Sequence, residues 1–397
     1  MPIIDDSAIA NVLTRGVENI YPDYQAAECA LKSGKKLRVY LGVDPTGSTL
    51  HMGHAIPLRK LAELQKLGHE AILLIGDFTA MIGDPTDKSA ARQRLTRKEV
   101  LANCRQYKTQ ASKFLSFTGK NPAKLLFNSA WLASMTFNDV VELAAHFTVQ
   151  QMSERDMFER RMKEGKPVYL HEFLYPLMQG YDSVAMDVDM EIGGNDQTFN
   201  MLAGRTMLRE TKKKEKLVLT TKLVTDPTGA KMGKTTGNMV ALSDTPEEMY
   251  GKVMSWTDAM IVPGFEICTN VPMDQVMRIA AAIKAGENPV QYKHELAHQI
   301  VSVLVSDKAA NAAAEHFVDI HKKRELPSDM PSLTHKRGMT VADALAASKL
   351  VSSKSDARRQ VEQGGVKMDG KPVSDPNVLV KKGAVLQKGK RHFVKLV

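Results

Sequence analysis

The chain has 397 residues, of which 43% are hydrophobic and 25% charged, an ordinary globular composition with length for two or three domains. No apolar run approaches the roughly 20 residues that a membrane span needs, and the N-terminus lacks a basic leader followed by an apolar run. The cysteines Cys29, Cys104 and Cys268 are isolated, which argues against a disulfide scaffold or a zinc knuckle. We therefore expect a cytoplasmic protein without membrane contact.

The net charge of +9 is unevenly distributed along the chain. Residues 339–397 contain 12 Lys and Arg against 5 Asp and Glu, whereas the rest is nearly balanced, with 42 basic and 40 acidic residues. From charge alone, a polyanionic partner bound by this tail and a solvated basic surface explain the excess equally well.

The first part of the chain alternates between strand and helix patterns. Apolar runs at 37–43 and 70–78 predict buried strands, and the helical period of 52–67 completes a strand–helix–strand unit of a parallel sheet. Thr96 and Glu99 form a capping box that predicts a long helix toward Gly119. Further strands are predicted at 124–132, 186–194 and 216–220, and further helices at 152–165, 171–186 and 195–210.

The alternation ends at about residue 225, which marks the boundary of an α/β region. Segments between 245 and 322 are rich in Ala and Met and helical in period, so we expect an all-α domain over 239–322. The stretch 323–338 contains two prolines and no periodicity, which predicts a linker. A small compact unit is expected over 339–397.

Two histidines, His51 and His54, follow the first predicted strand at the start of a helix. The free N–H groups of a helix N-terminus attract phosphate, and the imidazoles can donate hydrogen bonds to its oxygens. Gly53 between them lets a planar group approach the backbone. Two alternatives remain: a metal site, for which no third ligand of suitable spacing is visible, and ordinary surface histidines.

A turn-rich segment, 225–238, carries Lys231, Lys234 and Thr235. Gly229 and Gly233 enclose three residues where the Walker pattern needs four, which argues against a phosphate-loop NTPase. Two ammonium groups still suit a triphosphate, because charge builds up on the departing pyrophosphate. The alternative is a flexible basic surface loop.

The histidine segment and the lysine segment occur together, at the two ends of the predicted α/β region. H-M-G-H at 51–54 and K-M-G-K-T at 231–235 resemble the paired HIGH and KMSKS motifs of class I aminoacyl-tRNA synthetases. Further segments resemble the tyrosyl-tRNA synthetase family over essentially the whole chain: Y-L-G-V-D-P-T at 40–46, M-I-G-D-P-T at 81–86, Y-P-L-M-Q-G-Y-D at 175–182 and G-G-N-D-Q at 193–197. Two differences from the family pattern are Gly233 and Thr235 in place of serines, and D-Q-T-F-N in place of D-Q-W-G-N.

The resemblance implies a role for each matched residue. The phenol hydroxyl of tyrosine would be held by Tyr40 and Asp182, and its ammonium by Asp84, Tyr175 and Gln179. The adenosine and the activated carboxylate would meet Gly42, Asp44, Thr46, Gly53, Gly194, Asp196 and Gln197, the last also counted with the tyrosine site. Catalytic contacts to the phosphates would come from His51, His54, Lys88, Arg92, Lys231, Lys234 and Thr235.

The Tyr40–Asp182 pair has a physical rationale of its own. Tyrosine differs from phenylalanine by one hydroxyl, and a buried pair left unsatisfied by phenylalanine disfavours its binding. The alternatives are a core aromatic for Tyr40 and a helix-surface carboxylate for Asp182.

The tail resembles the small RNA-binding module first named for a ribosomal small-subunit protein. We expect a helix to about residue 347 and a second helix opened by Ser355, followed by a turn and strand that contain Lys367. Arg358 and Arg359, one turn into the second helix, suit the phosphates of folded RNA.

The resemblance thus implies a tyrosine–tRNA ligase with a Rossmann-like catalytic domain over 1–238, in which a helical insertion at about 96–170 carries a homodimer contact. The all-α anticodon-side domain, the linker and the α+β RNA-binding module come after it. The implied partners are tyrosine, ATP with magnesium, and tRNA(Tyr), without DNA, a protein-held metal or a prosthetic group. Two rivals are a tryptophanyl enzyme, disfavoured by Tyr181–Asp182 and the tail, and an RNA-binding protein that has lost activation, disfavoured by the intact histidines and lysines.

Overall fold

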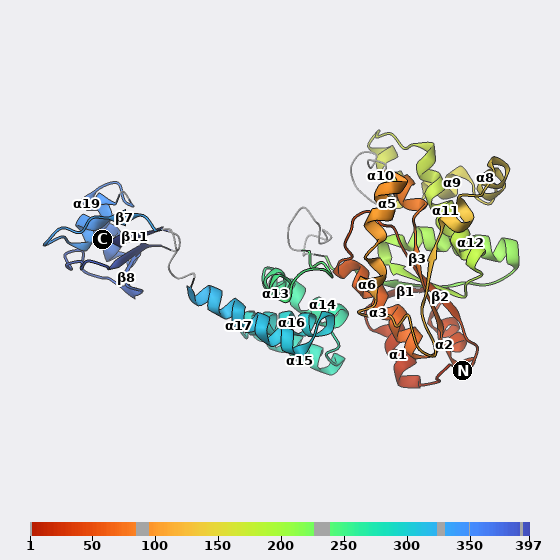
Figure 1. Cartoon of the computed structure of the whole chain (residues 1–397), viewed down its shortest axis with the longest axis horizontal. Coiled ribbons are helices and arrows are strands. Elements are labelled where there is room, and N and C mark those ends of the chain that lie inside the picture. The colour runs from red at the N-terminus through yellow and green to blue at the C-terminus, as the bar shows by residue number, and fades with distance from the viewer. Residues whose placement is uncertain (1, 85–94, 226–238, 324–329, 349, 390–391) are drawn as a thin grey trace. The chain divides into compact units, whose positions relative to one another are not determined.

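The computed structural model describes residues 2–84, 95–225, 239–323, 330–348, 350–389 and 392–397 (Figure 1). The chain divides into two compact units, Met1–Ala314 and Glu315–Val397, and each is described by itself.

A six-stranded sheet lies at the centre of the first unit (Figure 1). Its strands, in the order β1-β6-β5-β2-β3-β4, are β1 (Val17–Tyr21), β6 (Leu217–Thr221), β5 (Met190–Gly194), β2 (Arg38–Val43), β3 (Glu70–Ile75) and β4 (Lys124–Phe127). All neighbours pair in parallel except the edge strand β1, which runs antiparallel to β6. The central strands are almost wholly buried, as expected of parallel strands covered on both faces. The predicted parallel α/β fold is confirmed.

The helices that flank the sheet position the predicted site. α3 (Met52–Lys66) follows β2 and ends before Gly68, whose φ of 91° a glycine adopts at little cost. α11 (Leu170–Met186) packs closely on α12 (Thr198–Lys212) where the two helices meet at glycines. A Cβ added at Gly180 would lie only 3.3 Å from the backbone nitrogen of Gly204. The N-terminal helices α1 (Asp6–Thr14) and α2 (Tyr24–Lys32), and the strand β1, were not predicted.

The insertion is more broken than its sequence predicts. The Thr96–Glu99 capping box opens α5 (Arg97–Cys104), but the helix stops there and α6 (Tyr107–Ala111) follows, so the single long helix was wrong. The break lets α6 turn its side chains inward, where the Tyr107 hydroxyl donates to the Gly47 carbonyl at 2.6 Å.

Two other predicted elements of this region are divided. The predicted strand 124–132 is β4 followed by α7 (Ser129–Leu132), and α8 (Phe137–Ala144) comes next. The predicted helix 152–165 is divided between α9 (Val149–Ser153) and α10 (Asp156–Lys163), because Arg155 between them has extended backbone and a buried side chain. A short helix, α4 (Thr79–Ile82), follows β3.

The region 239–322 is helical, as expected. Its helices are α13 (Pro246–Met254), α14 (Ile261–Cys268), α15 (Met273–Lys284), α16 (Pro289–Leu304) and α17 (Asp307–Lys323). α16 ends with its C-cap at Val305, and the Ser306 hydroxyl accepts a hydrogen bond from the Ala309 N–H and starts α17. α14 was not predicted.

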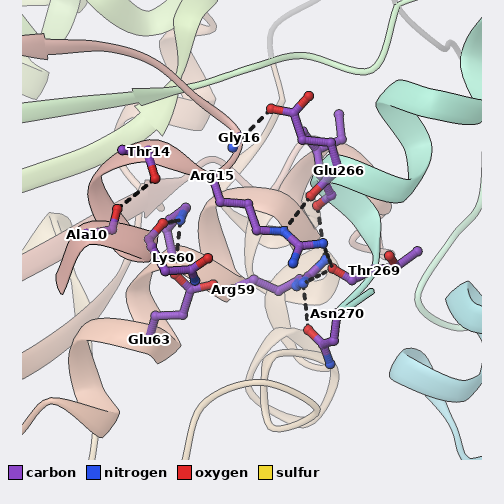
Figure 2. A network of polar contacts seen from close by, with 12 residues as sticks. Ala10, Thr14, Arg15, Gly16, Arg59, Lys60, Glu63, Glu266, Thr269 and Asn270 are labelled. Carbon is purple, nitrogen blue, oxygen red and sulfur yellow. Dashed lines mark hydrogen bonds and ion pairs between the residues drawn. The ribbon is translucent and has the colours of Figure 1, made fainter. Parts of the chain in front are cut away.

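Two arginines join α14 to the sheet domain (Figure 2). Arg15 donates to the Glu266 and Thr269 carbonyls at 2.9 and 2.8 Å, and Arg59 of α3 donates to the Thr269 carbonyl at 2.6 Å. The last carbonyls of a helix have no partner within it and carry partial negative charge, so guanidinium groups stabilise them. The helix that begins at the histidine pair is thus fixed to the helical region.

The second unit has a five-stranded sheet in the order β7-β11-β10-β8-β9. Its elements are β7 (Ser332–Leu333), α18 (Val341–Ala347), α19 (Lys354–Glu362), β8 (Val366–Met368), β9 (Lys371–Pro372), β10 (Val385–Lys388) and β11 (His392–Leu396). The second helix is capped by Ser353 and not opened by Ser355, because the Ser353 hydroxyl accepts from the Asp356 N–H. β7 lies inside the predicted linker and pairs with β11. Among the described residues of both units, no helix has the length and apolarity to cross a membrane.

Candidate active site

Several described residues of the predicted ATP site lie at the carboxyl ends of the parallel strands, where open α/β sheets bind ligands. Gly42 lies near the end of β2, and Gly194 is the last residue of β5. Gly42, Thr46, Gly53 and Asp196 are exposed along this edge of the sheet. A Cβ at Gly194 would lie 2.6 Å from Oδ1 of Asp196, so a larger residue here would displace the Asp196 carboxylate.

The histidine pair caps α3. Nδ1 of His51 accepts from the Gly53 N–H at 3.1 Å, and Nδ1 of His54 accepts from the His51 N–H at 3.2 Å. A neutral imidazole that accepts through Nδ1 carries its proton on Nε2. Both rings are half-buried, with centroids 4.0 Å apart, and each is set up to donate through Nε2.

The chain that comes after the lysine segment lies beside this cap. The Met52 N–H donates to the Val240 carbonyl at 2.9 Å, and His51 forms a backbone bridge with Ala241. The described residues that follow the second motif, Val240 and Ala241, are therefore held at the start of α3. The predicted residues Lys88, Arg92, Lys231, Lys234 and Thr235 lie outside the described residues.

Tyr40 and Asp182 are both buried, at 0% and 3% exposure, so the surface interpretation of Asp182 was wrong. The Asp182 carboxylate accepts from Trp131 Nε1 at 2.7 Å and from Asn128 Nδ2 at 3.3 Å. Burial raises the pKa of Asp182 well above its usual range, against the effect of these two hydrogen bonds. The Tyr40 ring packs in the core against Ile72, while its hydroxyl takes part in a polar network.

That network contains a buried ion pair that the sequence reasoning missed. Lys216 and Glu191 are 0% and 1% exposed and pair with each other, and Lys216 also donates to Oγ of Ser183 at 2.8 Å. Ser183 Oγ lies 3.0 Å from the Tyr40 hydroxyl, and the predicted Gln179 donates to Glu191 at 3.0 Å. Burial lowers the pKa of Lys216, and Glu191 opposes that effect. The only local signal was a charged residue in each of two apolar strand patterns.

A second cluster surrounds Asp84. Its Oδ2 accepts from Gln197 Nε2 at 2.9 Å, and its Oδ1 accepts from Arg155 Nη2 at 2.7 Å. The Tyr175 hydroxyl donates to Asp44 Oδ2 at 2.9 Å, and burial raises the pKa of Tyr175 well above its usual range. The structure thus brings predicted residues into contact in two pairs, Asp84 with Gln197 and Asp44 with Tyr175. Arg155 is an additional contact of Asp84 that the sequence did not indicate.

The second unit presents basic side chains on its surface. Arg358 and Arg359 are exposed on α19, and Lys367 is exposed on β8. Arg359 Nη2 donates to Asp356 Oδ1 at 2.6 Å. Within the described parts of both units, no group of three or more His, Cys, Asp or Glu side chains could hold a metal ion.

Comparison with known proteins agrees with this geometry. The family described as "tRNA synthetases class I (W and Y)" matches residues 32–322, and the "S4 domain" family matches residues 339–386. The "Tyrosine--tRNA ligase" of Symbiobacterium thermophilum is 42% identical over 396 residues, covering 97% of this chain and 96% of the relative. That of Moorella thermoacetica is 43% identical, covering 97% of this chain and 94% of the relative.

Solved structures share the fold. A C-terminally truncated mitochondrial tyrosyl-tRNA synthetase of Aspergillus nidulans has a TM-score of 0.67 at 22% identity, covering 80% of this chain and 94% of its own. The sequence matches, at 42–43% identity over 97% of the chain, show the family as well as the fold. The chain belongs to the class I tRNA synthetases and, within them, to the bacterial-type tyrosyl-tRNA synthetase family.

Proposed function

We propose that this chain is a tyrosine–tRNA ligase. A carboxylate oxygen of tyrosine attacks the α-phosphorus of ATP, the bond to the bridging oxygen breaks, and tyrosyl-adenylate and pyrophosphate form. The terminal ribose hydroxyl of tRNA(Tyr) then attacks the tyrosyl carbonyl, and AMP leaves. No side chain becomes covalently attached, so the protein contributes positioning and charge stabilisation.

The observation that carries this proposal is the buried Asp182 beside Tyr40. Trp131 and Asn128 hold its carboxylate, and its remaining acceptor capacity suits the phenol hydroxyl of a tyrosine substrate. Phenylalanine has no hydroxyl to offer, so it would gain no hydrogen bond from this remaining acceptor capacity. The indole N–H of tryptophan donates only, so it cannot accept a bond from the Tyr40 hydroxyl. This difference favours tyrosine over tryptophan.

The phosphates of ATP would be bound at the start of α3 and by the basic segments. Nε2 of His51 and of His54 would donate to phosphate oxygens, and the basic residues outside the described parts would stabilise the departing pyrophosphate. Magnesium usually binds through substrate phosphates and keeps several waters. It would arrive on ATP and neutralise charge on the triphosphate.

We also propose how this chain binds tRNA and how it assembles. Arg358, Arg359 and Lys367 would contact tRNA phosphates. The insertion and the start of α11 expose large apolar side chains, with Phe137 and Leu170 each 84% exposed, and such side chains favour a protein contact. We assign these side chains to the interface of a homodimer. We also propose that the protein is located in the cytoplasm. Light scattering should give twice the chain mass, and Leu170→Asp should shift the mass toward a monomer.

The function is tested by ATP–pyrophosphate exchange with tyrosine, tryptophan, phenylalanine and no amino acid. We expect exchange with tyrosine far above the other three conditions. Exchange stimulated most by tryptophan would favour the tryptophanyl enzyme, and no stimulation by any amino acid would favour an RNA-binding protein without activation.

A further inference from the structure

Arg155 occupies an unusual position beside the amino-acid site. It lies between α9 and α10, and its side chain is 6% exposed. Nη2 donates to Asp84 Oδ1 at 2.7 Å, and the guanidinium carbon lies 5.6 Å from the ring centroid of Phe158. Nη1 is buried and has no hydrogen-bond partner in the described parts of the chain.

A buried donor of a charged group is costly to leave unpaired, and native proteins seldom do so. Arg161, six positions further on, shows that this segment can satisfy a buried guanidinium. Its two terminal nitrogens donate to both oxygens of Glu172, at 2.7 and 3.0 Å, and to the Pro167 carbonyl. The free N–H of Arg155 therefore indicates an acceptor that is supplied from outside the protein.

The position of Arg155 suggests which acceptor this is. Asp84, its ion-pair partner, also accepts from Gln197 and is one of the residues that the family resemblance assigns to the substrate ammonium. An α-amino acid carries an ammonium and a carboxylate on one carbon. Asp84 and Arg155 present the opposite charges side by side, so each charge of the zwitterion would meet a partner of opposite sign.

We propose that Arg155 donates through Nη1 to the carboxylate of the tyrosine substrate and, with Asp84, recognises the α-amino acid zwitterion. This inference rests on the proposed function. Arg155 holds one carboxylate oxygen, and the other attacks the α-phosphorus of ATP. In the tyrosyl-adenylate the held oxygen is the carbonyl oxygen, which still accepts the same hydrogen bond.

The test compares two ligands that differ only at the carboxylate. Binding of L-tyrosine and L-tyrosinol, in which CH2OH replaces the carboxylate, is measured by titration calorimetry for the wild type and Arg155→Gln. A hydrogen bond to a charged group corresponds to about 10- to 150-fold in affinity. We expect Arg155→Gln to weaken tyrosine binding by about that factor and to leave tyrosinol binding unchanged or tighter.

Arg161→Gln is the matched control, because it removes a buried, ion-paired arginine of the same segment. It should leave the tyrosine-to-tyrosinol ratio as in the wild type. If Arg155→Gln weakens both ligands equally, Arg155 only supports Asp84, and the inference is wrong; it is equally wrong if neither ligand is affected.

A second variant covers a folding defect. Should the melting curve show that Arg155→Gln is unfolded, Arg155→Lys decides in the same way, since it keeps the charge but loses the fork of donors. Tyrosine-dependent exchange by the wild type is measured first. Its absence defeats the proposed function, whereas an active wild type with an unchanged ligand ratio in the variants defeats the inference alone.

Discussion

Replacement of Asp182 by Asn tests how this protein would tell tyrosine from phenylalanine. The carboxylate accepts from Trp131 Nε1 at 2.7 Å and from Asn128 Nδ2 at 3.3 Å, and in the proposed complex it accepts from the substrate hydroxyl as well. An amide has only one acceptor oxygen. If that oxygen stays on Trp131, the NH2 group faces the Asn128 amide and the substrate, so the substrate hydroxyl loses its acceptor.

The magnitude depends on the type of bond that is lost. A hydrogen bond to a charged group contributes about 1.5–3 kcal/mol, which corresponds to about 10- to 150-fold in rate or affinity. We therefore expect Asp182→Asn to lower kcat/KM for tyrosine in ATP–pyrophosphate exchange by about that factor. Exchange with phenylalanine, which has no hydroxyl to lose, should change less than about threefold, so discrimination decreases by nearly the whole factor.

The assay is exchange at subsaturating amino acid, with the KM for ATP as an internal control that should stay near the wild-type value. Equal losses for tyrosine and phenylalanine would mean that Asp182 supports the pocket without contacting the hydroxyl. Near-normal tyrosine kinetics would refute its assignment altogether.

Three further perturbations test other parts of the molecule. Lys231→Ala and Lys234→Ala should slow adenylate formation in pre-steady-state kinetics and leave tyrosine affinity unchanged, because they act as pyrophosphate charge develops; a loss confined to tyrosine binding would contradict this. The double change Arg358→Ala with Arg359→Ala should raise the KM for tRNA and flatten its salt dependence without altering exchange, and unaltered charging at physiological salt would make the tail a solvated surface. Hydrogen bonds from Lys354 and Thr340 lower the pKa of Asp343 to about 2, so its stabilisation of α18 is present above the unfolded pKa of about 3.9 and is lost as the pH falls through about 2. Amide exchange of α18, corrected for intrinsic rates, should show this loss in the wild type and not in Asp343→Asn.

The sequence predicted those parts of the fold that rest on local signals. α3 was expected to within one residue, because an apolar strand, a helical period of leucines and the glycine Gly68 all lie within one short stretch. β1 was missed because it is an edge strand whose residues are half-buried or exposed, so it has no apolar run. The insertion was misjudged because Tyr107 and Arg155 turn inward to distant partners, and those contacts break helices that local propensity would continue.

In the candidate site, too, local sequence signals found some residues and missed others. Sequence motifs predicted Tyr40, Asp84 and Asp182 as substrate-binding residues, and that assignment stays a prediction. The residues behind them were not found, because their partners are distant in sequence. Arg155 lies 71 positions from Asp84, and Lys216 lies 33 positions from Ser183. One clue was available, since a lysine at the start of an apolar strand is buried only where an opposite charge compensates it.

Charging of tRNA with labelled tyrosine tests the proposed activity most directly. The full-length protein, with ATP and total bacterial tRNA, should transfer tyrosine to acid-precipitable tRNA and should transfer neither tryptophan nor phenylalanine. If it charged tRNA with tryptophan instead, or bound tRNA without charging it with any amino acid, the chain would not be a tyrosine–tRNA ligase.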